Sequence, residues 1–139
     1  MLYLRYNKKQ KKVMRISEST VKKVFIWCKG NFGESEFHDT YPKLAISDVT
    51  EYLLGEFDDE NNILYVNVKK HENLMDLIAT VIHEYVHYLQ NTYEHYDRLY
   101  NEYVIDENAD YYKNPFEEEA RRISFQSCYP CYMAINNIK

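Results

Sequence analysis

The chain has 139 residues with 45% hydrophobic and 28% charged side chains, which is the balance of a soluble globular protein with a modest core. A formal net charge of −5 argues against nucleic acid as a partner. No stretch approaches the ~20 apolar residues of a membrane span, and three cysteines form no even-numbered disulfide framework. These properties, with no apolar secretory leader at the N-terminus, predict one cytoplasmic domain over residues 1–139 with its core at about 17–128.

Two elements are predicted in the first third of the chain. Residues 17–20 offer helix N-caps ahead of an apolar stripe at helical spacing, and Gly30 to Gly33 end that helix. A short strand is expected from Leu44 to Asp48. Residues 2–6 fit either a strand or an unstructured start.

The second half of the chain reads as a hairpin followed by helices. Residues 51–57 and 62–68 are the expected strands, joined by the turn at 58–61. The strongest helix is predicted from about Asn73 to about Tyr96. Residues 97–113 fit helix or loop, and a further helix opens at Asn114-Pro115. A separate short helix is expected after Pro130.

The strongest helix carries a metal-binding pattern. His83-Glu84-Tyr85-Val86-His87 matches H-E-x-x-H. At 100° per residue, His87 lies 40° around the helix from His83 and one turn further along, so both imidazoles reach one tetrahedral ion. Glu84 lies 100° from His83, where it is free to accept a proton from a water molecule. The sequence therefore predicts Zn²⁺ on the two histidines with Glu84 as the general base.

The faces of this helix support that prediction. With His83 at zero, an apolar face spans about 120° to 260° and a polar face about −20° to 100°. The histidines fall on the polar face, where a cleft can open. The apolar face comprises Leu74, Leu77, Ile78, Val81, Ile82, Tyr85 and Leu89.

A hydrolytic zinc site needs a third protein ligand and one open position. Three cysteines, His38, His71, His95 and several acids are possible. The best segment is 114–121. A second helix here can cross the active-site helix and supply a glutamate oxygen, and the small Ala120 lets the two helices approach closely. Glu117 and Glu119 lie about 200° apart on a helix, so only one of them can bind the ion.

His83-Glu84-x-x-His87 followed by Glu117-x-x-Ala120 resembles the gluzincin branch of zinc metallopeptidases, especially small domains of bacteria and their phages. The continuation to Gln90 gives the H-x-x-Q that such domains often show. A strand like residues 63–67 often precedes the helix and forms the edge along which peptide substrates extend. The resemblance covers about residues 62–123. Arg121 departs from the Asp or Asn that many relatives carry after the alanine.

The resemblance implies zinc on His83, His87 and Glu117, with Glu84 as the base and Glu119 as the alternative third ligand. It implies a small α+β, zincin-like domain in which a short antiparallel sheet packs on the active-site helix and a second helix bears a ligand. It also implies a metallopeptidase that hydrolyses peptide bonds in peptide or protein substrates. Relatives often use a Tyr or His to stabilise the oxyanion, and the candidates here are Tyr103, Tyr111 and Tyr112.

Two other functions stay open at this stage. One is a degenerate zincin that binds or assembles without catalysis, although retention of Glu84 speaks against it. The other is a different zinc amidohydrolase with an upstream cysteine ligand, for which only Cys28 is available. Cys128 and Cys131 have C-x-x-C spacing but are expected to be semi-buried thiols. Gln90 is expected either to support a metal ligand or to be solvated.

Overall fold

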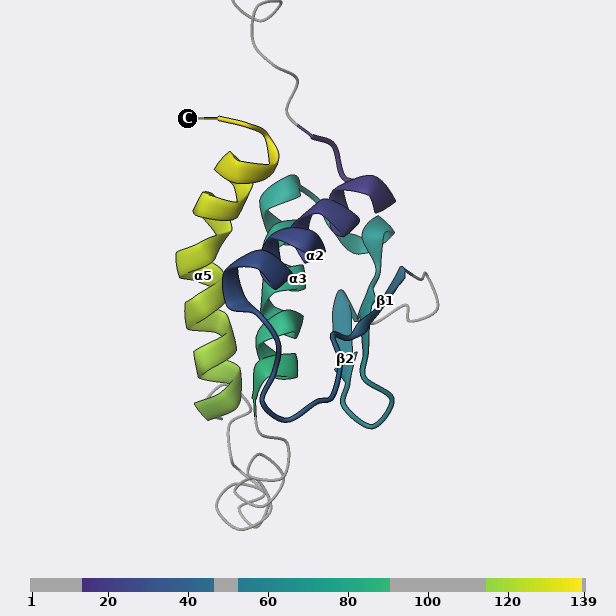
Figure 1. Cartoon of the computed structure of the whole chain (residues 1–139). Helices are drawn as coiled ribbons and strands as arrows, with labels where there is room; N and C mark the ends of the chain where they lie inside the picture. The colour runs from purple at the N-terminus through teal and green to yellow at the C-terminus, as the bar shows by residue number, and fades with distance from the viewer. Residues whose placement is uncertain (1–13, 47–52, 91–114, 139) are drawn as a thin grey trace, which may run out of the picture.

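The computed structural model describes residues 14–46, 53–90 and 115–138. In these residues it contains the helices α2 (Glu18–Phe32), α3 (Leu74–Leu89) and α5 (Pro115–Ile135), the strands β1 (Lys43–Ile46), β2 (Gly55–Asp58) and β3 (Ile63–Val66), and the 3-10 turn η1 (Val68–Lys70). Figure 1 shows α3 between α5 on one side and the sheet on the other, with α2 crossing it. The chain is therefore a small α+β fold around α3.

The first helix begins and ends as its sequence predicts. The Ser17 hydroxyl accepts a hydrogen bond from the Thr20 N–H at 3.2 Å and caps the start of α2. Gly33 follows the last turn at φ 75°, in the left-handed region that favours glycine, and its N–H donates to the Lys29 carbonyl.

The sheet is mixed, which corrects the prediction of an antiparallel sheet. The strand order is β1-β3-β2, with β3 parallel to β1 and antiparallel to β2. The hairpin of β2 and β3 is confirmed. The chain reaches β1 from α2, however, and β1 then pairs with β3 in the same direction. β3 is thus the central strand, so the expectation that residues 63–67 form the substrate edge is wrong. Of the two edge strands in the described sheet, β2 is the one that packs closely against α3.

α3 forms the centre of the core, and the predicted apolar face is confirmed. Asn73 caps its start by accepting from the Asp76 N–H at 2.9 Å. The residues predicted to be buried are buried or pack against the core, and Val86 and Tyr88 join them. Leu64 and Val66 of β3 are fully buried in the same cluster. None of the helices in the described residues combines the length and apolar character needed to cross a bilayer.

α3 ends earlier than predicted. Gln90 follows Leu89 in extended conformation, with φ −81° and ψ 151°, and terminates the helix. The sequence has no Gly or Pro at this point, so the polar and apolar periodicity gave no sign of a stop. The predictions for residues 2–6, 47–52 and 91–114, including His95, Tyr103, Tyr111 and Tyr112, lie outside the described residues.

α5 runs through Pro130, which corrects the prediction of a separate helix after it. Proline lacks the N–H that would bond the carbonyl four residues back. Here Pro130 and Gln126 are both exposed, so the unpaired carbonyl meets water. The buried face continues past the proline at Cys131 and Ile135, which favours a continuous helix.

α3 and α5 lie antiparallel. The Cys128 thiol contacts the Met75 carbonyl at the start of α3, at 3.3 Å. At the other end, Glu117 in the first turn of α5 contacts His83 and His87. This pairing brings the start of α5 to the end of α3 that carries the H-E-x-x-H residues.

Gly55 lets β2 approach α3 closely. A Cβ atom at this position would lie 2.8 Å from Cγ2 of Thr80, 3.0 Å from the Tyr65 carbonyl and 3.3 Å from Cγ of Glu84. Contacts below 3.0 Å force a shift, and here the neighbours include backbone. The glycine is thus a steric requirement of the site's wall.

Gly55→Ala is expected to lower the free energy of unfolding by about 1–3 kcal/mol because the added methyl group overpacks this contact. The measurement is chemical denaturation followed by circular dichroism. Gly30→Ala is the matched control, since nothing lies within 4 Å of its Cβ position on α2. That variant should gain about 0.5–1 kcal/mol, and a similar gain for Gly55→Ala would contradict the packing argument.

Candidate metal centre

The two histidines of the motif face one carboxylate on α5. His83 Nε2 lies 3.0 Å from Oε2 of Glu117, and His87 Nε2 lies 2.9 Å from its Oε1. The two Nε2 atoms are 3.2 Å apart. The one-turn spacing on α3 thus brings both rings to a single point, as predicted. Glu117 is buried, so this point is shielded from most of the solvent.

Glu117 and Glu119 are placed differently. Glu117 turns toward the histidines, while the exposed Glu119 accepts a hydrogen bond from Nε2 of Gln90 at 3.1 Å. The opposite directions follow from the roughly 200° between them on a helix. Ala120 is fully buried at the helix contact, which fits the predicted close approach of α5.

Glu84 borders the same point from the other side. The ligand atoms of His83, Glu84 and His87 all lie within 4.8 Å of one another, so these three residues could also hold a metal ion. The Phe57 N–H of β2 donates a hydrogen bond to the Glu84 carboxylate. Two carboxylates therefore flank the imidazoles, of which Glu117 is in direct contact with both rings.

Burial and charge shift the acids in opposite directions. Burial raises the pKa of Glu84, an effect that the nearby His87 and His83 reduce and the negative Glu117 reinforces. Burial alone would raise the pKa of Glu117 too. Its hydrogen bonds with His83 and His87 outweigh burial and hold its pKa well below the usual range. Glu84 is therefore the more basic of the two carboxylates.

The charge of His87 depends on the same carboxylates. Burial lowers its pKa, but the hydrogen bond to Glu117 and the negative charges of Glu84 and Glu117 raise it overall. The same carboxylates would attract a bound cation, which would have to displace the proton from the imidazole. The histidine ring is half-buried, which limits screening by solvent.

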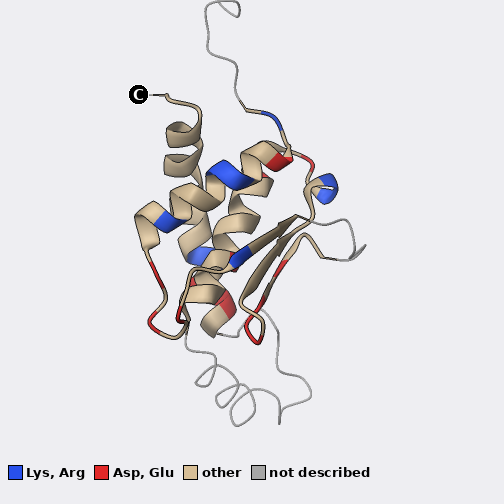
Figure 2. Ribbon diagram, turned by 45° about the vertical axis from the view of Figure 1, so that its right-hand side comes forward, with Lys and Arg blue, Asp and Glu red and all other residues tan. Residues whose placement is uncertain are grey.

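Acidic loops lie at this end of the molecule. Figure 2 shows Asp and Glu in the loop between α2 and β1, in the β2–β3 turn and at the starts of α2 and α5, while Lys and Arg lie on α2, β1, η1 and α5. Negative potential raises the local concentration of cations. The loops at this end of the molecule are acidic, although Arg121 and Arg122 follow on α5.

Two tyrosines of α3 hold the loop between α2 and β1. The Tyr85 hydroxyl donates to the Gly33 carbonyl. The Tyr88 hydroxyl donates to the Thr40 carbonyl at 2.8 Å and accepts from the Ser35 N–H at 3.1 Å. The tyrosines buried in the core thus satisfy their hydroxyls by bonding to the loop between α2 and β1.

The other candidate third ligands that lie in the described residues have other partners or are buried thiols. His71 Nε2 bonds the Thr80 hydroxyl at 2.8 Å, and His38 pairs with Asp59 at 3.0 Å. All three cysteines are free and buried, which exceeds the semi-burial expected for Cys128 and Cys131. Burial, and then the proximity of Cys128, raises the pKa of Cys131 to about 12, and burial also raises the pKa of Cys28. These thiols are poor thiolate ligands.

The sequence reasoning missed the role of β2. The Phe57 N–H donates a hydrogen bond to Glu84, the candidate base, and Gly55 lets β2 approach α3 closely. The available signal was the isolated glycine in a strand-like run, which often marks a close backbone approach.

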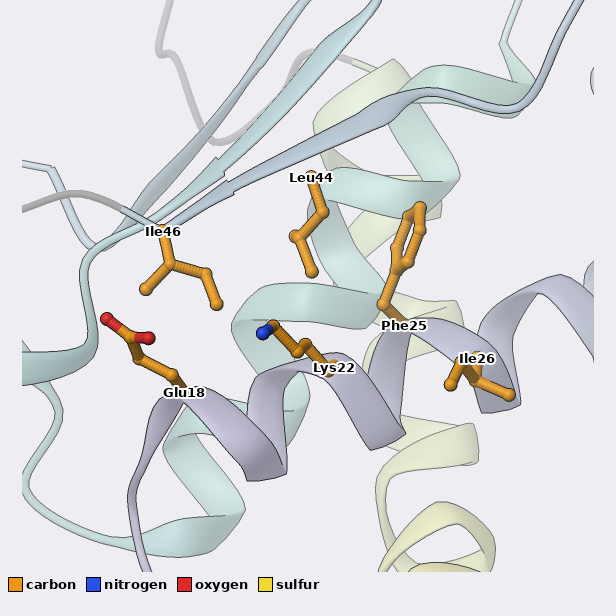
Figure 3. Close-up of a pocket in the computed structure, with 6 residues that line it drawn as sticks. All are labelled: Glu18, Lys22, Phe25, Ile26, Leu44 and Ile46. Atoms are coloured by element: carbon orange, nitrogen blue, oxygen red, sulfur yellow. The ribbon is translucent and has the colours of Figure 1, made fainter.

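A hollow of about 460 Å³ lies between α2 and β1, away from the motif residues. Figure 3 shows Leu44 and Ile46 of β1 facing the α2 side chains. Its charged lining residues are Glu18 and Lys22, so it lacks a set of metal ligands. The full lining is Glu18, Lys22, Phe25, Ile26, Leu44 and Ile46.

No family model, curated protein or solved structure matches this chain.

Proposed function

We propose that this protein is a zinc-dependent metallopeptidase in which His83, His87 and Glu117 hold the ion and Glu84 is the general base. The observation that carries the proposal is the contact of one buried carboxylate, Glu117, with the Nε2 atoms of both motif histidines. Nothing in a structural helix pair requires two imidazoles and a carboxylate to converge in this way. Two nitrogens and one carboxylate oxygen are a donor set that zinc prefers in hydrolases.

The spacing of the donors fits this ion. With zinc–ligand distances of about 2.0–2.1 Å, tetrahedral ligand atoms lie about 3.3 Å from each other. The two Nε2 atoms are 3.2 Å apart. Each of them lies about as far from a different oxygen of Glu117, with His83 at 3.0 Å from Oε2 and His87 at 2.9 Å from Oε1. The carboxylate would have to turn so that it offers one oxygen, or both, to an ion between the two rings.

Glu84 is suited to proton transfer. Zinc, when bound, supplies a Lewis acid that lowers the pKa of a water molecule to about 7. Glu84 accepts the proton of the attacking water and delivers it to the departing amine nitrogen. Its burial raises its pKa, which strengthens it as a base, and the Phe57 N–H holds its carboxylate in place.

β2 supports a peptide as the substrate. It is an edge strand of the described sheet and runs past Glu84. Leu54 accepts from the Asn67 N–H, so in the antiparallel ladder Gly55 and Phe57 direct their backbone groups away from β3. Because the Phe57 N–H already donates to Glu84, an extended peptide would add to this edge through main-chain hydrogen bonds with Gly55 and the Phe57 carbonyl.

The purified chain is expected to carry about one equivalent of zinc, because three ligands and an open position describe a single hydrolytic site. Elemental analysis measures the stoichiometry, and a mixed peptide library measures cleavage. Chelation should abolish cleavage, and added zinc should restore it. A metal-free protein with full peptidase activity would overturn the proposal. Stoichiometric zinc without cleavage of any peptide would instead indicate a binding module.

A further inference from the structure

We propose that Gln90 is a positioning residue that fixes the orientation of His87 and ties it to the helix that carries Glu117. This inference rests on the proposed zinc site and concerns how the chain builds it. Gln90 is the residue that ends α3, and its exposed fraction is only 7%. A buried amide at a helix end must satisfy its acceptor and both of its donors.

The amide oxygen holds the imidazole. Oε1 of Gln90 accepts a hydrogen bond from Nδ1–H of His87 at 2.7 Å. A proton held on Nδ1 leaves the lone pair on Nε2 for a metal ion. Nε2 is the atom that faces Glu117 and His83. The oxygen of Gln90 thus selects both the tautomer and the direction of the ring.

The amide nitrogen holds the second helix. Nε2 of Gln90 donates to the Phe116 carbonyl at 2.9 Å and to Oε1 of Glu119 at 3.1 Å. Both acceptors lie in the first turn of α5, on either side of Glu117. With both N–H groups engaged, the side chain spans from one histidine ligand to the backbone that positions the carboxylate ligand.

This link matters because the two ligand-bearing helices are far apart in sequence. Residues 90 and 116 are connected through the chain by a long segment, yet Gln90 joins them with one side chain. The same interaction accounts for the early end of α3, since the extended conformation at Gln90 lets its amide reach α5. A solvated glutamine would make neither contact.

Gln90→Leu is expected to weaken zinc affinity about 10- to 100-fold, the usual cost of losing an outer partner of a ligand histidine. Gln90→Glu should recover much of this loss because its carboxylate still accepts from His87. The measurement is competition with a chromophoric chelator, with circular dichroism to confirm folding. If Gln90 served only to tie α3 to α5, Gln90→Glu should not recover the affinity, because the glutamate loses both bonds that the amide nitrogen donates.

The double variant Gln90→Glu/Glu119→Gln tests the bonds to His87 and to α5 without the added negative charge of the single variant Gln90→Glu. It exchanges the amide and the carboxylate, so the net charge is unchanged and position 119 now donates to position 90. Its zinc affinity should return close to that of the unchanged chain, and its Co²⁺ absorption spectrum should match. Equal zinc affinity in Gln90→Leu and the unchanged chain would overturn the role of Gln90 alone. An unchanged chain that binds no zinc would overturn the proposed function itself.

Discussion

Glu84→Gln is expected to lower the peptide-cleavage rate by about 10²- to 10⁴-fold, the usual contribution of a general base, while zinc remains bound. The glutamine keeps the size of the side chain, and its amide oxygen can still accept from the Phe57 N–H that holds Glu84. Only the capacity to take a proton is lost. Turnover of a cleaved peptide and zinc content are measured on the same sample.

Glu72→Gln is the matched control for this variant. It makes the same change at an exposed glutamate just before the start of α3, at the end of that helix opposite the motif, and it should leave cleavage unchanged. Two outcomes would contradict the assignment of Glu84. Full activity of Glu84→Gln with zinc bound would show that the base is elsewhere. Loss of zinc would show that Glu84 is itself a ligand, as its position within 4.8 Å of both histidines allows.

The positions of His83, Glu84 and His87 could be predicted because they depend on a single helix. Within one helix, 100° per residue fixes which side chains share a face, and the buried residues of α3 follow that rule. Val86 departs from it, since it is buried outside the predicted apolar face. α5 covers that flank of the helix, as the contacts of Glu117 with His83 and His87 show. A single helix's periodicity cannot tell where a second helix will pack.

The features that sequence missed depend on contacts between distant segments. The parallel pairing of β1 with β3 follows from the path of the whole chain, and neither strand's residues specify it. Pro130 is a local stop signal that the continuous buried face of α5 overrides. The end of α3 at Gln90 has no Gly or Pro to mark it, and at this point the Gln90 side chain contacts α5.

The choice of a third ligand, as proposed above for Glu117, could be predicted only in part. Spacing confined the choice to Glu117 or Glu119, because the two point in opposite directions on one helix. Which of them faces α3 depends on how α5 rotates about its own axis. In this structure the buried positions Ala120 and Ser124 fix that rotation, and Glu117 faces the histidines. The resemblance to gluzincins had favoured the same residue.

Glu117→Ala is therefore expected to cost more zinc affinity than the roughly 100-fold that loss of an outer hydrogen-bond partner costs. It removes the carboxylate that contacts both imidazoles and leaves two ligands, which is too few for a stable site. Chelator competition measures the affinity, and thermal unfolding of the metal-free chain shows whether the variant is folded. Peptide cleavage should fall with zinc occupancy.

Glu119→Ala and Glu118→Ala test this assignment with the same change of charge on the same helix turn. Both glutamates are exposed. Glu119→Ala removes one of the two acceptors of the Gln90 amide and leaves the Phe116 carbonyl, so we expect a loss smaller than the roughly 10-fold lower limit for an outer-partner change. Glu118→Ala should have no measurable effect. If Glu119→Ala lost zinc while Glu117→Ala kept it, α5 would have to turn about 160–200° when the metal binds. Such a rotation would bury Glu119 in place of Ala120 and Ser124, and the packing of α5 on α3 described above would not survive it.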